Sequence, residues 1–200
     1  MSDLFEEKSK DWDSNDIVQK ISSSVGESIL SHLTLNTQMS VMDFGAGTGL
    51  ICHQIAPLVK KITAVDISRS MLDKLVKKTT LTADVEAVCQ DITKKPLNQQ
   101  FDLIVSAMAM HHISDTDQLL DTFQRHLKPE AKVALADLDS EDGSFHPKGT
   151  EGIYHHGFKR DELQAALEKS GFRQIKFITV HTVVKAQKSY PVFLAIATKA

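Results

Sequence analysis

The sequence predicts an α/β protein with a seven-stranded, mostly parallel sheet, helices on both faces and a C-terminal antiparallel hairpin. From residue 39 onward, short runs that are almost continuously apolar alternate with helical patterns, as buried parallel strands and crossover helices do. The last two β-type runs are instead joined by a short polar link, which is typical of an antiparallel pair. The seven runs lie at residues 41–44, 61–67, 85–92, 101–108, 132–138, 174–185 and 190–198.

Helical patterns occupy the segments around these runs. Residues 50–59 and 68–78 predict helices, the first ending near Pro57 and the second capped by Ser68. Residues 115–127 carry apolar side chains on one face, and residues 159–170 precede a glycine that can cap a helix in the left-handed conformation. An amino-terminal helix that packs on the sheet is predicted from apolar residues at helical spacing, namely Ile17, Ile21, Val25, Leu30 and Leu33.

The composition indicates one soluble domain over residues 1–200. The formal net charge is -3 and lysines and arginines are scattered, which argues against a nucleic-acid partner. Cys52 and Cys89 fall in an expected helix and an expected strand, so we expect two reduced, buried thiols. No apolar run approaches the roughly 18 residues of a membrane span, and no export signal is visible, so we expect a cytoplasmic protein.

The most informative stretch is VMDFGAGTGL at residues 41–50, where an apolar strand runs into three alternating glycines and then a helix. Gly45, Gly47 and Gly49 allow the backbone to approach a ligand closely, and the helix start presents free N–H groups. Asp43 would repel a pyrophosphate but suits a cationic amino-acid group. The third glycine falls one position too early for the dinucleotide pattern G-x-G-x-x-G. The loop therefore predicts a nucleotide cofactor that is not a dinucleotide.

This stretch resembles motif I of the class I S-adenosylmethionine-dependent methyltransferases. The resemblance implies a Rossmann-like fold, S-adenosylmethionine as cofactor and S-adenosylhomocysteine as product. It divides the chain into an N-terminal cap and helix at 1–38, a cofactor-binding half at 39–139, and a substrate loop with helix and hairpin at 140–200. Within the family, the chain is most similar to the small-molecule branch that includes ubiquinone and menaquinone methyltransferases.

The resemblance also implies roles for individual residues. Asp66 ends the second strand, about twenty residues past the loop, where the family binds ribose hydroxyls. Asp91 matches the position that bonds the adenine amine, and Met71 could line the adenosine; turn chemistry and core packing are the alternatives for these two. The full set of expected cofactor-binding residues is Asp43, Gly45, Ala46, Gly47, Thr48, Gly49, Asp66, Ile67, Met71, Asp91, Ile92, Ser106 and Ala107.

Histidines follow the fourth strand in the sequence SAMAMHHISD. Ligands bind outside the carboxyl ends of strands in open α/β sheets, so His111 or His112 could face the reacting methyl as a base. His155, from a second histidine pair, is the third candidate catalytic residue, and packing is the alternative for each. Neighbouring side chains diverge, so such a pair is poorly suited to chelating one metal ion, and we predict no metal site.

Two segments are expected to cover the acceptor. Residues 139–158 are longer than most connections, show no helical or strand period, and follow the fifth strand. Phe145, His146, Tyr154 and His155 would face inward if this segment is a lid, and the alternative is a solvated loop. The polar amino terminus carries Trp12, the only tryptophan, which would either anchor a second cover or lie in the core.

The predicted function is direct displacement of the sulfonium methyl by an unidentified, small-molecule acceptor. No D-P-P-Y-like tetrapeptide follows the fourth strand, which argues against base methylation. A nicotinamide oxidoreductase is disfavoured by the glycine spacing, Asp43 and the lack of a Y-x-x-x-K pair. The remaining alternatives are a protein or RNA methyltransferase and a non-catalytic S-adenosylmethionine-binding module.

Overall fold

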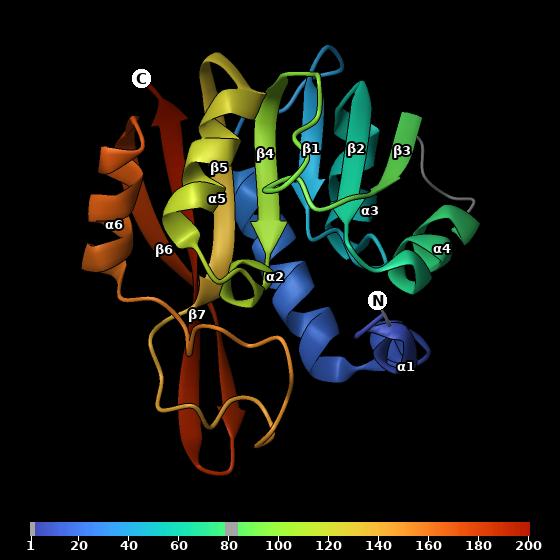
Figure 1. Ribbon diagram of the computed structural model, residues 1–200, viewed down its shortest axis with the longest axis vertical. Helices are drawn as coiled ribbons and strands as arrows, with labels where there is room; N and C mark the ends of the chain where they lie inside the picture. Colours follow the sequence, from blue (N-terminus) through green and yellow to red (C-terminus); the bar gives the residue numbers. More distant parts are fainter. Residues whose placement is uncertain (1–2, 79–83) are drawn as a thin grey trace.

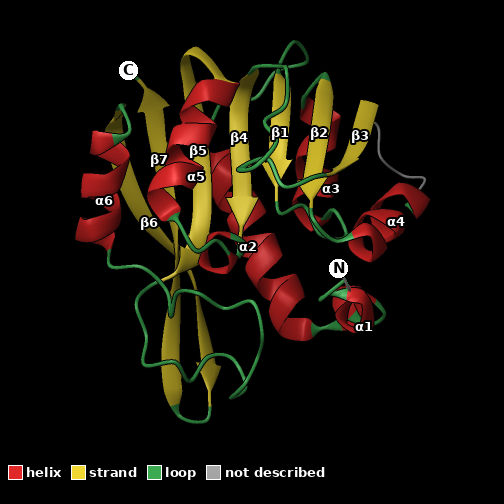
Figure 2. Ribbon diagram, in the orientation of Figure 1, coloured by secondary structure: helices red, strands yellow, loops and turns green. Residues whose placement is uncertain are grey.

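The computed structural model describes residues 3–78 and 84–200, which form one seven-stranded sheet flanked by helices (Figures 1 and 2). The strand order is β3-β2-β1-β4-β5-β7-β6; β1 to β5 pair in parallel and β7 is antiparallel to both neighbours. The strands are β1 Ser40–Phe44, β2 Lys61–Asp66, β3 Asp84–Cys89, β4 Phe101–Ala107, β5 Leu127–Leu138, β6 Phe172–Lys185 and β7 Lys188–Lys199. The predicted fold class is confirmed. The first two residues of the expected cap lie outside the described residues.

Helices cover both faces of the sheet, as expected. One apolar cluster packs α2, α3 and α4 on one face of the sheet. A second cluster packs α5 and α6 on the other face, which is turned toward the viewer in Figure 2. The helices are α1 Glu6–Ser9, α2 Asp16–His32, α3 Leu50–Ile55, α4 Arg69–Lys77, α5 Thr116–His126 and α6 Arg160–Lys169, with 3-10 turns η1 Trp12–Ser14, η2 Ala56–Leu58 and η3 Met110–His112. No helix in the described ranges is long and apolar enough to cross a membrane.

Capping side chains fix several helix boundaries. The Ser68 hydroxyl accepts the Met71 N–H at 3.2 Å, which confirms the predicted cap of α4. The Asp115 carboxylate accepts the Gln118 N–H at 2.9 Å and starts α5. Gly171 follows α6 with φ 83°, the left-handed conformation predicted for it.

Several boundaries differ from the expected ones, and three of them have a clear local cause. β3 ends at Cys89 rather than at residue 92, because the Asp91 carboxylate accepts the Thr93 N–H at 3.0 Å and turns the chain. β5 begins at Leu127, directly after α5, where it pairs with Phe101 across a register shift. α3 ends at Ile55 and continues as η2, whose first turn contains a proline. Cys52 is buried as expected, whereas Cys89 is only partly buried, on the edge strand.

The β6–β7 hairpin extends beyond the carboxyl ends of the parallel strands, and residues 139–158 run beside this extension (Figure 1). A bridge between Asp139 and Phe158 closes the base of the segment. The Tyr190 hydroxyl on β7 lies 2.7 Å from the Ser144 hydroxyl, and the Tyr154 N–H donates to the His111 carbonyl at 3.0 Å. The long segment is therefore fixed over the carboxyl edge of the sheet.

Candidate functional site

A cavity of about 890 Å³ lies at the carboxyl ends of the central parallel strands. The glycine loop after β1, the ends of β2 and β4, and η3 form its inner wall. Residues 4–22 and part of the 139–158 segment form its outer wall. The volume falls within the ~300–1,000 Å³ typical of small-molecule sites. The cavity is therefore large enough for a nucleoside cofactor, and two separate chain segments cover it.

The glycine loop has the backbone geometry that the sequence predicts. Gly45 has φ 69°, and a Cβ atom there would lie 2.3 Å from the Cβ of Ala109. The Gly47 N–H donates to Asp66 Oδ2 at 2.8 Å, so the loop is tied to the end of β2. Glycine at residue 45 tolerates the positive φ and has no Cβ to clash with Ala109, so the loop can pack closely against the segment that follows β4.

Asp43 is the acidic residue at the end of β1, and its side chain is almost completely buried. Burial raises the pKa of Asp43 to about 7, and the nearby charge of Asp66 adds to this, while the thiol of Cys52 opposes it. The Cys52 Sγ–H donates to Asp43 Oδ2 at 3.1 Å. A cationic group in the cavity would favour the ionised carboxylate.

Asp66 and Asp91 line the same half of the cavity. Asp66 Oδ1 accepts the Ser68 N–H at 2.8 Å, and burial raises the pKa of the Asp66 carboxyl. Asp91 Oδ2 lies 2.7 Å from Lys94 Nζ, and its side chain is about a third exposed. Three carboxyl groups from the ends of β1, β2 and the turn after β3 thus face one half of the cavity.

His111 on η3 lines the other half of the cavity and forms a pair with Asp137 on β5. His111 Nδ1 lies 2.8 Å from Asp137 Oδ1, and the His111 backbone N–H donates to Asp137 Oδ2 at 3.2 Å. The Leu138 N–H also donates to Asp137 Oδ1, at 2.8 Å. Since a carboxylate accepts, Nδ1 of His111 donates to Asp137, and in the neutral imidazole this tautomer leaves the lone pair on Nε2. That Nε2 is buried and has no hydrogen-bond partner within residues 3–78 and 84–200.

Two further imidazole rings lie beside His111. The His112 ring centroid is 4.2 Å from that of His111, and the His146 centroid is 5.1 Å away. Burial lowers the pKa of both His112 and His146 to about 4, and His111 adds to this effect. His112 Nδ1 donates to the Gly152 carbonyl at 2.6 Å. The His112 and His146 rings are therefore neutral at neutral pH. Separately, the described residues contain no group of three or more His, Cys, Asp or Glu side chains placed to bind a metal ion.

The N-terminal segment connects the two halves of the cavity. Asp3 Oδ2 accepts the Ser70 N–H at 3.0 Å, which attaches the segment to α4. Asp13 Oδ2 lies 2.7 Å from Lys78 Nζ, and Asp13 Oδ1 accepts the Thr48 hydroxyl. On the other side, the Phe5 ring packs edge-on against His112, with centroids 5.3 Å apart. Trp12 lines the cavity and is only partly buried, so it belongs to this cover rather than to the core.

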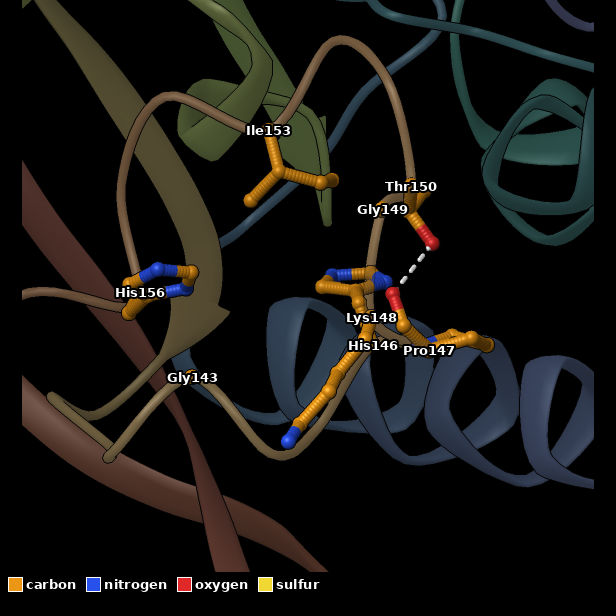
Figure 3. A pocket seen from close by; sticks show the side chains of 8 residues that line it. All are labelled: Gly143, His146, Pro147, Lys148, Gly149, Thr150, Ile153 and His156. Atoms are coloured by element: carbon orange, nitrogen blue, oxygen red, sulfur yellow. Dashed lines mark hydrogen bonds between the residues drawn. The ribbon is translucent and has the colours of Figure 1, made fainter.

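A smaller cavity of about 240 Å³ lies within the 139–158 segment (Figure 3). His146 and Pro147 line both cavities and so form the wall between them. The Thr150 hydroxyl donates to the Pro147 carbonyl at 2.8 Å, drawn as the dashed line in Figure 3, while the Lys148 side chain points away from that contact. Phe145, His146 and Tyr154 line the larger cavity, which agrees with a cover, but Tyr154 is 62% exposed and so does not face inward as expected.

The family described as a methyltransferase domain matches residues 18–176 of this chain. The chain belongs to the class I S-adenosylmethionine-dependent methyltransferases. An uncharacterised methyltransferase of Schizosaccharomyces pombe is 32% identical over 135 residues, which are 60% of this chain and 48% of that protein. A malonyl-acyl-carrier-protein O-methyltransferase of Geobacter sulfurreducens is 28% identical over 190 residues, covering 86% of this chain and 69% of that protein. The chain spans about half the length of several such relatives, 48% for two of them.

Solved methyltransferase structures share the fold. A S-adenosylmethionine-dependent methyltransferase of Aquifex aeolicus superposes with a TM-score of 0.72 at 23% identity, over 100% of both chains. A chain from the complex between the Trm112 methyltransferase activator and a methyltransferase of Haloferax volcanii superposes with a TM-score of 0.82 at 16% identity, over 99% of this chain and 98% of that one. At these identities the likeness concerns the fold.

The residues of this methyltransferase fit S-adenosylmethionine in shape and charge. The loop at Gly45 leaves no room for a Cβ, and the acidic half of the cavity suits the cationic groups of the cofactor. Nine of the thirteen cofactor-binding residues expected from the sequence line the cavity, namely Asp43, Gly45, Ala46, Gly47, Asp66, Ile67, Met71, Asp91 and Ala107.

The other four lie behind this lining. Thr48 binds the N-terminal cover through Asp13, and Gly49 begins α3 with φ 83°. Ile92 is fully buried in the core cluster that includes α5, and Ser106 is 1% exposed. Of the three expected catalytic histidines, His111 and His112 line the cavity. His155 does not, because its Nε2 lies 2.9 Å from the Ile113 carbonyl and its ring packs on Phe158.

Proposed function

We propose that this methyltransferase transfers the methyl of S-adenosylmethionine to a protic oxygen, nitrogen or sulfur of a small acceptor, with His111 as the general base. The observation that supports this most directly is the buried, unpartnered Nε2 of His111, in the cavity that also contains the glycine loop. Asp137 acts as a positioning residue, because its contact with Nδ1 selects the tautomer that leaves Nε2 free to accept a proton.

The cofactor supplies an electrophilic methyl on a sulfonium sulfur, whose displacement leaves the neutral thioether S-adenosylhomocysteine. His111 Nε2 accepts the proton of the acceptor X–H group as X forms its bond to the methyl carbon, and the electron pair of the broken C–S bond stays on sulfur. Asp137 then faces an imidazolium that its carboxylate stabilises. The proton leaves to solvent when the covers open.

His111 is a better candidate base than its neighbours. A general base works best with a pKa near the working pH, and the pKa of His112 and of His146 is lowered to about 4. His112 and His146 therefore serve as neutral walls or hydrogen-bond partners of the acceptor. Positioning in a closed cavity can supply roughly 7–11 kcal/mol of the barrier, and a base adds about 10²–10⁴-fold. Loss of His111 should thus reduce turnover without abolishing it.

In the cofactor half, we assign the amino-acid group to the side of Asp43 and the ribose hydroxyls to Asp66. Asp91 would bind the adenine amine at the open end, with Ile67 and Met71 on either side of the ring. Asp66 Oδ2 is bonded to the Gly47 N–H and Oδ1 to the Ser68 N–H. Each oxygen keeps a second lone pair for a hydroxyl. The cavity, which two chain segments cover, favours a small acceptor over a folded protein or RNA, and an O-methyltransferase among the relatives is consistent with an oxygen acceptor.

Ligand-dependent thermal unfolding tests the cofactor assignment first. At a hundred times the dissociation constant, S-adenosylmethionine or S-adenosylhomocysteine should add about 2.7 kcal/mol of stability, whereas NADH should add none. Transfer of a labelled methyl to a panel of small phenols, thiols, amines and acids then identifies the acceptor. With that acceptor, His111→Gln should lower kcat by about 10²–10⁴ at unchanged S-adenosylhomocysteine affinity. His181→Gln, on β6 beside Ser24, is the matched control. Equal turnover of the two variants would remove the base role.

A further inference from the structure

Two lysines without a carboxylate partner face the half of the cavity assigned to the acceptor. Lys8 on α1 and Lys185 at the end of β6 both line the cavity. Neither ammonium group forms an ion pair with any carboxylate in the part of the chain that the structure describes. Lys94, also in the lining, is instead paired with Asp91 at 2.7 Å. These two positive charges come from separate segments, and both lysines are exposed rather than buried.

Aromatic rings hold both ammonium groups near the cavity wall. Lys8 Nζ lies 5.2 Å from the centroid of the Phe5 ring. Lys185 Nζ lies 6.0 Å from the Phe145 centroid and donates to the Phe145 carbonyl at 2.8 Å. Such contacts attract a cation without neutralising it. Each lysine keeps N–H donors for a ligand.

The same rings connect the lysines to the proposed base. Phe5 packs against His112 with centroids 5.3 Å apart, and Phe145 packs against His146 at 4.9 Å. Both of these imidazoles contact the ring of His111. Lys8 on the N-terminal cover and Lys185 at the end of β6 are therefore each connected to the base through one phenylalanine and one imidazole. The charge of Lys8 also contributes to the lowered pKa of His112 and of His146, after burial and the neighbouring histidines.

Most acidic residues of the lining have other partners or lie in the other half. Asp43, Asp66 and Asp91 belong to the cofactor half. Glu7 is paired with Lys10 at 2.8 Å, and Asp115 caps α5. Asp11 also lines the cavity, on the same segment as Lys8, so charges of both signs face this half and the two lysines are its cations.

We propose that the acceptor carries an anionic group, a carboxylate or a phosphate monoester, which binds to Lys8 and Lys185 and orients the nucleophile toward His111. This inference rests on the proposed methyl transfer and specifies its substrate class. The anionic group is a recognition element and stays unmethylated, while the protic group reacts. An anion in this position pairs with both lysines and so connects the N-terminal cover to the β6–β7 hairpin through one ligand.

Isothermal titration of the full chain with simple amphiphiles tests the charge preference. The probes are octanoate, octyl phosphate, octanol and octylamine, which share one apolar tail, each added to protein saturated with S-adenosylhomocysteine. The variants are Lys8→Gln, Lys185→Gln and the double variant. Lys20→Gln, on α2, and Lys188→Gln, at the start of β7, are the controls, because neither lysine lines the cavity.

We expect at least one anion to bind about tenfold or more tightly than octanol and octylamine, with each cavity variant losing about fivefold or more and both controls unchanged. Preference between octanoate and octyl phosphate separates the two anion types. Equal binding of octanol, tighter binding of octylamine, or anion binding that survives the double variant would overturn the proposal. Failure of both anions to bind would also overturn it. S-adenosylhomocysteine is also titrated into the unmodified protein on its own. If it does not bind while the anions still bind in a lysine-dependent way, the proposed function is contradicted and the anion site is not.

Discussion

His111 Nδ1 lies 2.8 Å from Asp137 Oδ1, and both side chains are almost completely inaccessible to solvent. His111 lies on η3, which follows β4, and Asp137 lies on β5, the strand beside β4. Asp137 accepts three N–H groups in all, from the His111 ring, the His111 backbone and the Leu138 backbone. The carboxylate therefore holds η3 against β5 as well as orienting the imidazole.

Asp137→Ala should be strongly destabilising, because it leaves three donors without an acceptor in a site closed to water. Each such group costs about 1–3 kcal/mol, so the free energy of unfolding should fall by about 3 kcal/mol or more, which lowers Tm by roughly 6–12 °C. Thermal unfolding measures this. Asp139→Ala is the matched control, since Asp139 pairs with Arg160 in a partly exposed site and should cost no more than about 1 kcal/mol. Equal losses of stability in the two variants would mean that the buried contacts of Asp137 stabilise the fold no more than the partly exposed pair of Asp139.

Asp43 should make the ligand-free protein less stable as pH rises. The pKa of Asp43 is raised from 3.8 to about 7 in the folded protein, chiefly by burial. Between these two values the folded state binds more protons than the unfolded state, so stability is highest at low pH and is lost as pH rises through about 7. Asp43→Asn should remove this part of the pH dependence. Thermal unfolding of both proteins from about pH 5 to about pH 8 measures it, and parallel curves would contradict the assignment.

The cofactor half could be predicted well from the sequence because its signals are local. Residues 41–50 contain the strand, the glycines and the helix start in one stretch, and Ser68 caps α4 within its own turn. Side-chain direction explains why some of the expected residues do not line the cavity. Successive residues of a strand face opposite sides, so Ala107 lines the cavity while Ser106 is buried on the face that carries α5 and α6.

The acceptor half depends on contacts between distant segments, which explains why its residues were harder to choose. No sequence signal points to Asp137, although it precedes the end of β5 by one residue and so reaches the same sheet edge as the His111 turn. The sequence favours His155 as a catalytic residue, yet of His146 and His155 only His146 lines the cavity. The direction of side chains in an irregular 20-residue segment depends on its anchors to η3 and β7, which no local pattern encodes.

Trp12 should report opening of the N-terminal cover. It is the only tryptophan and lines the cavity, so S-adenosylhomocysteine should change its fluorescence. Asp13→Asn weakens the contact with Lys78, a partly exposed pair, and should raise the dissociation constant about two- to fivefold, mainly through faster release. Asp16→Asn, in the first turn of α2, is the control and should change little. The difference in dissociation constant between Asp13→Asn and the unmodified protein should shrink at about 1 M salt. If Asp13→Asn leaves the dissociation constant unchanged, the N-terminal cover does not retain the ligand.

Gly45 allows the conformational and steric requirements of the cofactor loop to be measured separately. Gly45→Ala places a side chain at φ 69° and puts its Cβ 2.3 Å from the Cβ of Ala109. Gly149→Ala has a similar φ of 80° but meets nothing within 4 Å, so it should lose only the roughly 1–2 kcal/mol of left-handed backbone.

Gly45→Ala should lose more stability than Gly149→Ala and should also abolish S-adenosylhomocysteine binding. Adding Ala109→Gly removes the atom that clashes, so the double variant should recover toward the loss of Gly149→Ala once the effect of Ala109→Gly alone is subtracted. Denaturant unfolding of the four variants completes this cycle. If the effects of the two substitutions simply add, the close approach between the loop and the segment after β4 does not explain why glycine is needed, and backbone conformation alone does.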